Sequence, residues 1–310
     1  MTLNERAALL ADDLINHAEA WRVGSTTVAG ARVIDCGGAV PGGLNAGLAM
    51  ARICLAGHAD VSLTSLDGGP AIQVWSDDPV RACLGSQYAG WQIKVDKFFA
   101  MGSGPMRAAY GKEAMFDHLP HLREQPPCAV GVLETRKHPT EDVVAWLVAK
   151  LPTSVEKLTL CVAPTSSIAG TVQVVARSLE TALHKLHELK VDLGEVVSGM
   201  GVAPLPPIAA DEIRGIGWTN DAILYGAHVT LWVKTDDELL ATWGPKVPSN
   251  ASPDHGAPFA ELFNKAGGDF YKIDPMLFSP AMVTFHNLKS GRSHTFGQRE
   301  PGILRKSFTT

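Results

Sequence analysis

The residues with the clearest catalytic potential lie on a predicted helix over residues 169–189. At about 100° per residue, Gln173, Arg177, Glu180 and His184 form one stripe beside a stripe of apolar residues. Arg177 and Glu180 are three residues apart, and Glu180 and His184 are four apart, so all three side chains share one side of the helix. A carboxylate that an arginine keeps ionised, at the edge of a buried face, has the chemistry of a general base.

The same spacing also fits a solvated helix face. An exposed pair of Arg177 and Glu180 would stabilise the helix by only a few tenths of a kcal/mol. A single helix histidine such as His184 is more often structural than catalytic. This helix alone therefore leaves both interpretations open.

Composition places the chain among ordinary globular proteins. Of its residues, 45% are hydrophobic and 19% are charged. Its length of 310 residues is enough for two domains. The net charge of −5 and the scattered Lys and Arg residues argue against a nucleic-acid partner. We expect no membrane span, because no stretch approaches about 18 uncharged apolar residues, and the N-terminus lacks the form of a signal peptide. Five widely spaced cysteines without a C-x-x-C pair indicate buried thiols in a reducing cytoplasm.

Two glycine loops are the next candidates. Residues 35–43 hold four glycines and a proline between a predicted strand and a predicted helix, where backbone amides can cradle an anion. The loop matches neither G-x-G-x-x-G nor a Walker A sequence, and its glycines can equally serve close packing. The second loop, residues 101–107, contains Gly102, Ser103 and Gly104 and fits either a polar ligand contact or a plain turn.

Other side chains carry two interpretations each. Ser86, Gln87, Tyr88 and Trp91 precede the second glycine loop, and the two aromatic rings can stack on a flat ligand or fill the core. Asp221 can bind a ligand or cap a helix. The cations that can bind a phosphate group, or simply lie on the surface, are Lys94, Lys97, Arg107 and Lys272.

Hairpins and meanders mixed with helices predict an α+β fold rather than a doubly wound sheet. We expect two subdomains. The first comprises residues 1–126, completed by residues 246–310. The second comprises residues 127–245 and carries the helix with Glu180. Residues 199–207 read as a proline-rich loop and residues 222–233 as a strand.

Motifs spread in order over nearly the whole chain resemble those of the methenyltetrahydromethanopterin cyclohydrolase family. Each motif is weak alone, but the set is specific. The motifs are VIDCG at 33–37, PGG at 41–43, AGL at 46–48, CLGSQYAGWQI at 83–93, FAMGSGP at 99–105, ARSLETALHKL at 176–186, TNDAILYG at 219–226, FYKIDP at 270–275 and LFSPA at 277–281.

The resemblance implies a homotrimer of α+β subunits, each with two subdomains and a substrate cleft between them. It implies no metal, and the reaction that it implies needs no other cofactor. The implied reaction is the reversible hydrolysis of the methenyl bridge of 5,10-methenyltetrahydromethanopterin to 5-formyltetrahydromethanopterin, so the expected partner is a small-molecule pterin. The resemblance makes Glu180 the essential carboxylate and Arg177 its neighbour. It also implies that the loops line the pocket. Together with the charged candidates above, these loops give the predicted substrate-binding set, which comprises Ser86, Gln87, Tyr88, Trp91, Lys94, Gly102, Ser103, Gly104, Asp221 and Lys272.

Two other functions compete with this one. A non-catalytic carrier of a phosphorylated pterin or nucleotide would use the glycine loops but would not need Glu180 beside Arg177. A nucleotide-dependent oxidoreductase would use residues 101–105, yet no acidic residue follows at the distance that a dinucleotide site requires.

Overall fold

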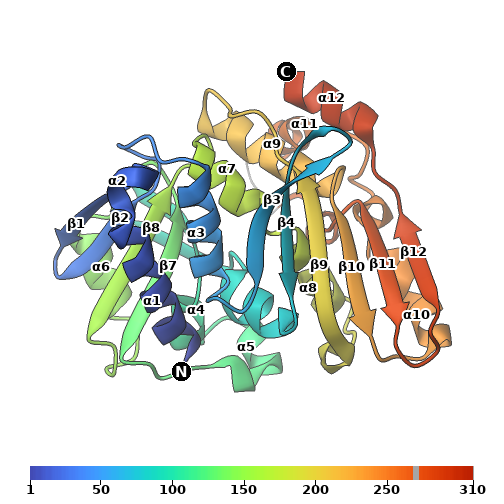
Figure 1. Ribbon diagram of the computed structural model, residues 1–310, viewed down its shortest axis with the longest axis horizontal. Helices are drawn as coiled ribbons and strands as arrows, with labels where there is room; N and C mark the ends of the chain where they lie inside the picture. Colours follow the sequence, from blue (N-terminus) through green and yellow to red (C-terminus); the bar gives the residue numbers. More distant parts are fainter. Residues whose placement is uncertain (268–271, 310) are drawn as a thin grey trace. The chain divides into compact units, whose positions relative to one another are not determined.

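The computed structural model describes residues 1–267 and 272–309, which form two compact units (Figure 1). The first unit comprises Met1–Ala59 and Arg81–Gln173, and the second comprises Asp60–Val80 and Val174–Thr310. Each unit is built on a six-stranded mixed sheet with helices packed against it. The expected α+β class is confirmed.

The first unit begins with a helix closed by a capping box between Thr2 and Glu5. Its α-helices are α1 (Leu3–Asn16), α2 (Ala18–Trp21), α3 (Leu44–Cys54), α4 (Met106–Tyr110), α5 (Met115–His118), α6 (Glu141–Val148) and α7 (Ile168–Val175), whose last two residues belong to the second unit. A π-helix, η1 (Arg81–Gln87), and a short 3-10 helix, η2 (Pro120–Leu122), complete the helices that are described. The strands are β1 (Gly24–Val28), β2 (Ala31–Asp35), β5 (Trp91–Val95), β6 (Phe98–Ser103), β7 (Cys128–Glu134) and β8 (Lys157–Ala163).

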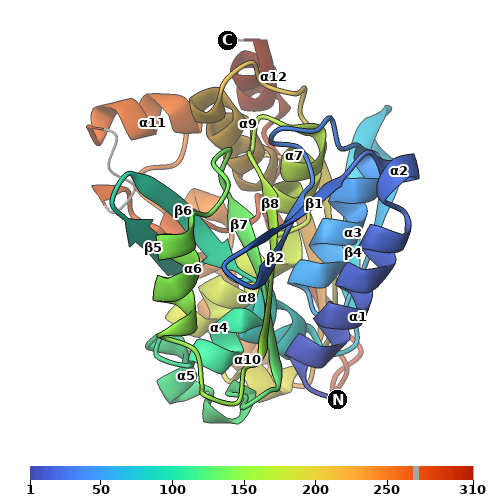
Figure 2. The ribbon, with the colours of Figure 1, turned by 90° about the vertical axis from the view of Figure 1, so that its left-hand side faces the viewer.

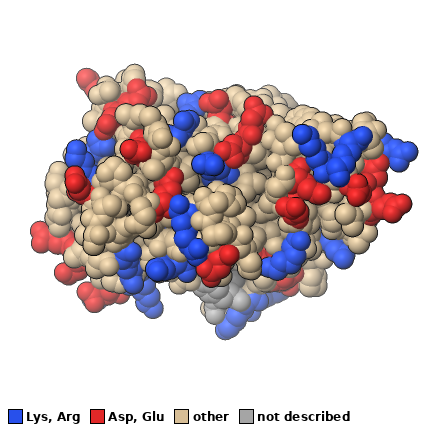
Figure 3. Space-filling model, turned by 90° about the horizontal axis from the view of Figure 1, so that it is seen from below, with Lys and Arg blue, Asp and Glu red and all other residues tan. Residues whose placement is uncertain are grey.

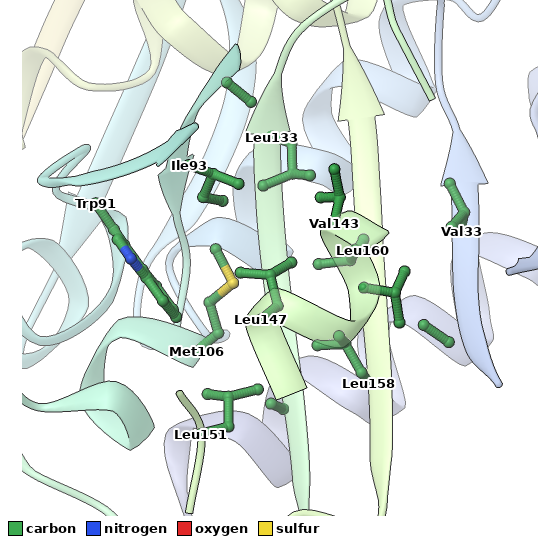
Figure 4. Close-up of a cluster of buried hydrophobic side chains, with 14 of the residues drawn as sticks. Val33, Trp91, Ile93, Met106, Leu133, Val143, Leu147, Leu151, Leu158 and Leu160 are labelled. Carbon is green, nitrogen blue, oxygen red and sulfur yellow. The ribbon is translucent and has the colours of Figure 1, made fainter. Parts of the chain in front are cut away.

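The sheet of the first unit has the order β1-β2-β8-β7-β6-β5. Strands β2, β8 and β7 are parallel, so their carboxyl ends meet at one edge, while the outer strands pair antiparallel. Helix α6 covers one face, and α1 and α3 lie on the other (Figure 2). Leu133, Leu160 and Leu147 belong to the apolar core under α6, and Trp91 closes one end of this cluster (Figure 4).

The second unit carries the candidate catalytic helix. Its strands are β3 (Asp60–Leu66), β4 (Gly69–Ser76), β9 (Val196–Pro204), β10 (His228–Val233), β11 (Met282–Asn287) and β12 (Ser293–Gly297). Its α-helices are α8 (Ser178–Glu188), α9 (Glu212–Leu224), α10 (Asp237–Trp243), α11 (Phe259–Lys265) and α12 (Pro301–Thr309). The 3-10 helices with described bounds are η3 (Leu193–Glu195), η4 (Gly244–Lys246), η5 (Ser249–Ala251) and η7 (Pro275–Leu277).

The sheet of the second unit has the order β12-β11-β10-β9-β4-β3, and only the β10/β11 pair in it is parallel. Helix α8 packs on β4, β9 and β10. Helices α11 and α12 both pack on α9, and Tyr225, Phe259 and Leu277 form a smaller apolar cluster there.

These units have other bounds than the division expected from the sequence. Residues 60–80 form the β3–β4 hairpin, and β4 pairs with β9, so this hairpin belongs to the second unit. Residues 127–163 contain β7 and β8, and β8 pairs with β2, so they belong to the first unit. Long-range strand pairing thus sets the division, and local composition does not reveal such pairing.

Three predicted elements were wrong. The helix over 169–189 is interrupted between α7 and α8. Residues 199–204 belong to strand β9 rather than to a loop, and residues 222–224 end helix α9 rather than begin a strand. Asp211 caps α9 by accepting a hydrogen bond from the Arg214 amide, a signal that the sequence analysis did not use.

The distribution of surface charges and the lengths of the helices agree with what the composition predicts. Acidic and basic side chains are interspersed on the face drawn in Figure 3. Within residues 1–267 and 272–309, no helix is long and apolar enough to cross a membrane.

Candidate active site

The break between α7 and α8 fixes the backbone around the candidate catalytic pair. Arg177 is the N-cap residue of α8, with φ −83° and ψ 3°, and Glu180 lies in the first turn. The positive end of the helix dipole favours a negative charge at this position. The interruption therefore places Glu180 where a continuous helix could not stabilise its charge.

Both side chains of the pair are buried. Arg177 and Glu180 each expose 5% of their surface, and Leu179 and Leu183 on the same helix are fully buried. The solvated-face interpretation is therefore wrong for these two residues. Withdrawing two ionisable groups from water costs free energy. Buried charged groups of this kind are often found at functional sites.

His184 lies one turn further along α8. Its Nε2 atom is 3.7 Å from Oε1 of Glu188, a partly exposed side chain at the end of α8. This contact favours the structural interpretation of His184.

Two glycines of β9 allow the start of α8 to lie close to the sheet. A Cβ atom at Gly199 would come within 2.7 Å of Cδ1 of Leu179. A Cβ atom at Gly201 would come within 2.5 Å of Oγ of Ser178 and 3.0 Å of the Leu179 amide nitrogen. Close approach of the strand and the helix, rather than a loop conformation, explains these glycines.

In the first unit, the π-helix η1 and the second glycine loop bring four predicted substrate-binding residues together. The Gly104 amide donates to the Ser86 carbonyl (3.0 Å), and Ser86 Oγ donates to the Cys54 carbonyl (2.6 Å). Cys54 Sγ lies 3.3 Å from Ser103 Oγ and 3.9 Å from the Gln87 carbonyl oxygen. Single π-helical turns occur frequently at functional sites.

Arg107 holds the π-helix in place. Its Nη1 atom donates to the carbonyls of Leu84 and Ser86, and its guanidinium pairs with Glu113. The guanidinium carbon also lies 4.9 Å from the centre of the Tyr88 ring. Arg107 is fully buried, so these contacts rather than a phosphate group account for it.

Trp91 and Gly102 lie on the core face of the first sheet. Trp91 pairs with Gly102 across β5 and β6 and stacks on Tyr110, with 4.1 Å between the ring centres. A Cβ atom at Gly102 would come within 2.8 Å of Ile93 and 2.9 Å of Met106. Packing therefore explains both residues. Gly104 has φ +86°, so its own backbone conformation requires glycine.

The remaining cations of the substrate-binding set are exposed. Lys94 lies on β5 and Lys272 just before η7, and both are solvent-accessible. Phe270 and Tyr271, which belong to the same motif as Lys272, lie outside the described residues.

The first glycine loop does bind an anion, but the anion is a side chain of the same chain. Asp35 accepts hydrogen bonds from the amides of Gly37, Gly38 and Ala39, and from Nε2 of His138 at 2.9 Å. Burial alone would raise the pKa of Asp35, but these hydrogen bonds lower it below its usual value. The loop amides are thus used to hold the end of β2.

Asp221 is fully buried and ties three helices together. It lies on α9, accepts from the Phe259 amide at the start of α11 (2.8 Å) and accepts from Ser307 Oγ of α12 (2.5 Å). Burial raises its pKa to about 7, against the lowering effect of these two hydrogen bonds. The helix-cap interpretation of Asp221 accounts for these contacts.

Two polar side chains of the interior had no predicted role: Gln173, which lies on the predicted polar stripe, and Lys185. Gln173 is fully buried, and its Nε2 atom donates to Oε1 of Glu134 at 3.2 Å. Lys185 is also buried, its Nζ atom donates to the Met276 carbonyl, and burial lowers its pKa to about 8. The position of Glu134 at the end of a buried strand was a usable signal, whereas nothing local marks Lys185 as buried.

Among the residues that the structure describes, no three His, Cys, Asp or Glu side chains are grouped so that they could hold a metal ion. The five cysteines are free.

Comparisons with known proteins agree on one family. A family profile described as "Cyclohydrolase (MCH)" matches residues 2–308. Three similar proteins carry the name methenyltetrahydromethanopterin cyclohydrolase. The protein of Rhodopirellula baltica is 49% identical over 99% of this chain and 94% of its own length. The protein of Methylobacillus flagellatus is 44% identical over 99% of this chain and 95% of its own length. That of Methanococcoides burtonii is 40% identical over 99% of this chain and 98% of its own length. The chain belongs to the methenyltetrahydromethanopterin cyclohydrolase family.

Proposed function

We propose that this chain hydrolyses the methenyl bridge of 5,10-methenyltetrahydromethanopterin to give 5-formyltetrahydromethanopterin, and catalyses the reverse reaction. The family comparisons support the reaction, because named relatives match the chain over nearly its whole length. The observation that carries the site is the burial of Arg177 and Glu180 at the start of α8.

In the proposed first step, water adds to the methenyl carbon, which shares a positive charge with its two nitrogens. Glu180 takes one proton from the attacking water, so that the carbon–oxygen bond forms without a free hydronium ion. The product of this step is a neutral tetrahedral carbinol. The negative charge of Glu180 also favours the cationic substrate.

In the second step, the bond between this carbon and N10 breaks. The proton held by Glu180 passes to N10 as it leaves, and the carbinol hydroxyl loses its proton as the formyl C=O forms on N5. The sum is methenyl cation plus water giving formyl compound plus one proton. A single carboxylate thus acts as base and then as acid.

Arg177 is assigned to position Glu180 and to keep it ionised. The Arg177 amide donates a hydrogen bond to the Val174 carbonyl, and this bond fixes the backbone position from which the side chain extends. The reaction requires a base and a water, and we propose that it proceeds without a metal or organic cofactor. Activity that is unchanged after exhaustive dialysis against a chelator would support this, and loss restored by zinc would refute it.

For substrate binding we assign the cluster around η1, with Ser86, Gln87 and Ser103 as polar contacts. Tyr88, Lys94 and Lys272 are assigned as peripheral contacts. The predicted set also contained Trp91, Gly102, Gly104 and Asp221, but their packing and backbone roles explain those four without a ligand.

The trimer rests on the resemblance alone, and the cytoplasmic location rests on the five cysteines, whose spacing indicates free thiols of a reducing compartment. We propose a homotrimer in the cytoplasm, and closed three-fold rings are a common form of homo-oligomer. Light scattering at micromolar protein concentration that gives a monomer mass would refute the trimer.

The activity is tested by incubating the purified chain with the methenyl substrate and following the loss of its absorbance. Catalysed hydrolysis supports the proposal. Binding without turnover would instead support the alternative, a non-catalytic carrier of a phosphorylated pterin or nucleotide.

A further inference from the structure

The sheet of the second unit has one face against α8 and an opposite face. Gly199 of β9 faces α8, and side chains alternate along a strand, so Ser198 and Met200 point to the opposite face. The register places Trp75 of β4 beside Met200 and Trp232 of β10 beside Ser198. We call this surface the outer face: it is the side of β4, β9, β10 and β11 that carries Trp75, Ser198, Met200 and Trp232.

The outer face is uncharged over the middle of the sheet. In the described strands β4, β9, β10 and β11, which are the four central strands, no outward side chain is Lys, Arg, Asp or Glu. A sheet face that stays in water is usually polar. The core of a protein interface is instead depleted of charges and enriched in aromatic residues and methionine. The composition of the outer face is therefore that of an interface core.

A groove of about 480 Å³ lies on the outer face. Ser198 and Met200 form its floor, because β9 lies between β4 and β10, and Trp75 and Trp232 line it on either side. Leu288, which follows β11, also lines the groove. Trp75 exposes 39% of its surface and Leu288 exposes 48%. Exposed apolar side chains gathered in this way mark an interaction site.

Several polar groups of the outer face are already hydrogen-bonded within the chain. Nε2 of His228 lies 2.9 Å from Oγ1 of Thr284, which lies 3.0 Å from Oγ1 of Thr295. At the edge of the groove, Ser198 Oγ donates to Oδ1 of Asp77 at 2.7 Å. Covering paired groups costs less free energy than covering unpaired ones. A partner that contributes mainly apolar surface can therefore withdraw this face from water.

The size of the outer face fits a subunit interface. Six strands about 4.8 Å apart and about 20 Å long span roughly 600 Å², before the relief of the side chains is added. A stable interface covers about 800 Å² on each partner, and interfaces between identical subunits are more apolar than transient ones. A second copy of this chain therefore fits the face better than a small ligand or a transient partner does.

We propose that copies of this chain associate through the outer face, with an apolar part of one copy seated in the groove between Trp75 and Trp232 of the next. This inference rests on the proposed homotrimer and assigns its interface. In a closed three-fold ring, each interface joins two different surfaces. The groove of each copy thus meets a different surface of its neighbour.

The test uses Trp232→Glu and Trp75→Glu in the full chain. Each variant removes one wall of the groove and adds a charge that the interface would have to bury without a partner. Light scattering over a dilution series gives the mass of each protein. We expect a trimer for the wild type, and dissociation of each variant at a protein concentration at least about thirtyfold higher, as for the loss of an interface tryptophan.

The matched control is Ile213→Glu. Ile213 is an apolar residue of α9 that exposes 61% of its surface, so the change in charge and polarity is similar but lies outside the outer face. Its dilution profile should match that of the wild type. Circular dichroism checks the fold of each variant. If the two glutamate variants do not fold, Gln73→Lys places a charge at a half-buried position of the groove without removing a large side chain, and should weaken the trimer in the same direction.

Two outcomes would overturn the inference while leaving the trimer in place. One is a folded set of groove variants that dissociate at the same concentration as the wild type. The other is an equal loss of association in Ile213→Glu, which would make the effect unspecific. A wild-type chain that is already a monomer would overturn the proposed trimer itself, so the two failures are distinguishable.

Discussion

Gly201 of β9 lies directly against Ser178, the first residue of α8, so closely that a Cβ atom on the glycine would be 2.5 Å from the serine Oγ. The Leu179 amide nitrogen lies 3.0 Å from the same point. Because Arg177 and Glu180 flank these two residues, the absence of a side chain at Gly201 sets the height of this proposed catalytic pair above the sheet. The strand and the pair are thus coupled by packing.

The first prediction tests this coupling with Gly201→Ala. The hydroxyl of Ser178 can rotate away, but the Leu179 backbone cannot, so the start of α8 must shift. We expect kcat to fall at least about tenfold, since displacements of about 1 Å can cost up to about a hundredfold. The thermal midpoint should fall by a few degrees, as measured by calorimetry.

The control is Gly302→Ala in α12, where a new Cβ would meet nothing within 4 Å. It should leave kcat unchanged and the thermal midpoint equal or slightly higher, because alanine favours a helix. A Gly201→Ala enzyme with wild-type kcat and midpoint would show that the close approach is not needed.

These contacts also explain what the sequence could and could not predict. The sequence predicted that Arg177 and Glu180 lie in one stripe beside buried leucines, because helical periodicity is a local property. The break before Ser178 was not, since no glycine or proline marks it. Residues 199–204 were misread for a related reason: Gly199 and Gly201 look like loop residues but serve helix packing on a strand.

The candidate site was predictable to a similar extent. Ser86, Gln87 and Ser103 were predicted from motifs as substrate contacts, which stays a prediction, and the structure joins them through Cys54. The buried roles of Arg107 and Asp221 could not be predicted, because their partners are brought close only by the tertiary fold.

A second prediction tests whether Trp91 serves core packing or substrate binding. Trp91→Phe removes part of the stack on Tyr110 and should lower the free energy of unfolding by roughly 1–3 kcal/mol. The KM of the folded variant should stay within about twofold of wild type. Urea unfolding and steady-state kinetics measure the two effects, and a tenfold rise in KM with unchanged stability would instead assign Trp91 to the substrate.

A third prediction concerns the pH dependence of stability through Asp221. Its pKa rises from 3.8 to about 7 on folding. A raised pKa means that the folded state binds the proton more tightly, so the stabilisation is complete below about pH 4 and is lost as pH rises through 7. At about 1.4 kcal/mol per pKa unit, the change amounts to up to about 4 kcal/mol.

Asp221→Asn keeps an acceptor for the Phe259 amide but cannot titrate. The decline in unfolding free energy between pH 4 and pH 7, measured by urea denaturation, should therefore be smaller by that amount in the variant. Parallel pH profiles of the variant and the wild type would contradict a titrating Asp221.

A fourth prediction concerns Arg177. Arg177→Ala removes the positive charge that favours the ionised carboxylate of Glu180, so activity should fall and reach its maximum at a higher pH than in the wild type. Combined with Glu180→Gln, it should lower kcat little further, because the two residues act as one unit. Additive losses in the double variant would mean that Arg177 acts independently of Glu180.

The central claim is that Glu180 takes the proton from water, and kcat of Glu180→Gln tests it most directly. Glutamine keeps the size of the side chain but removes the base. Glu188→Gln, the same substitution at a more exposed position of α8, is the matched control and should retain wild-type kcat. With the fold of both variants checked by circular dichroism, we expect kcat of Glu180→Gln to fall by about 10²–10⁴-fold. A folded Glu180→Gln enzyme with kcat within about threefold of wild type would contradict the catalytic assignment.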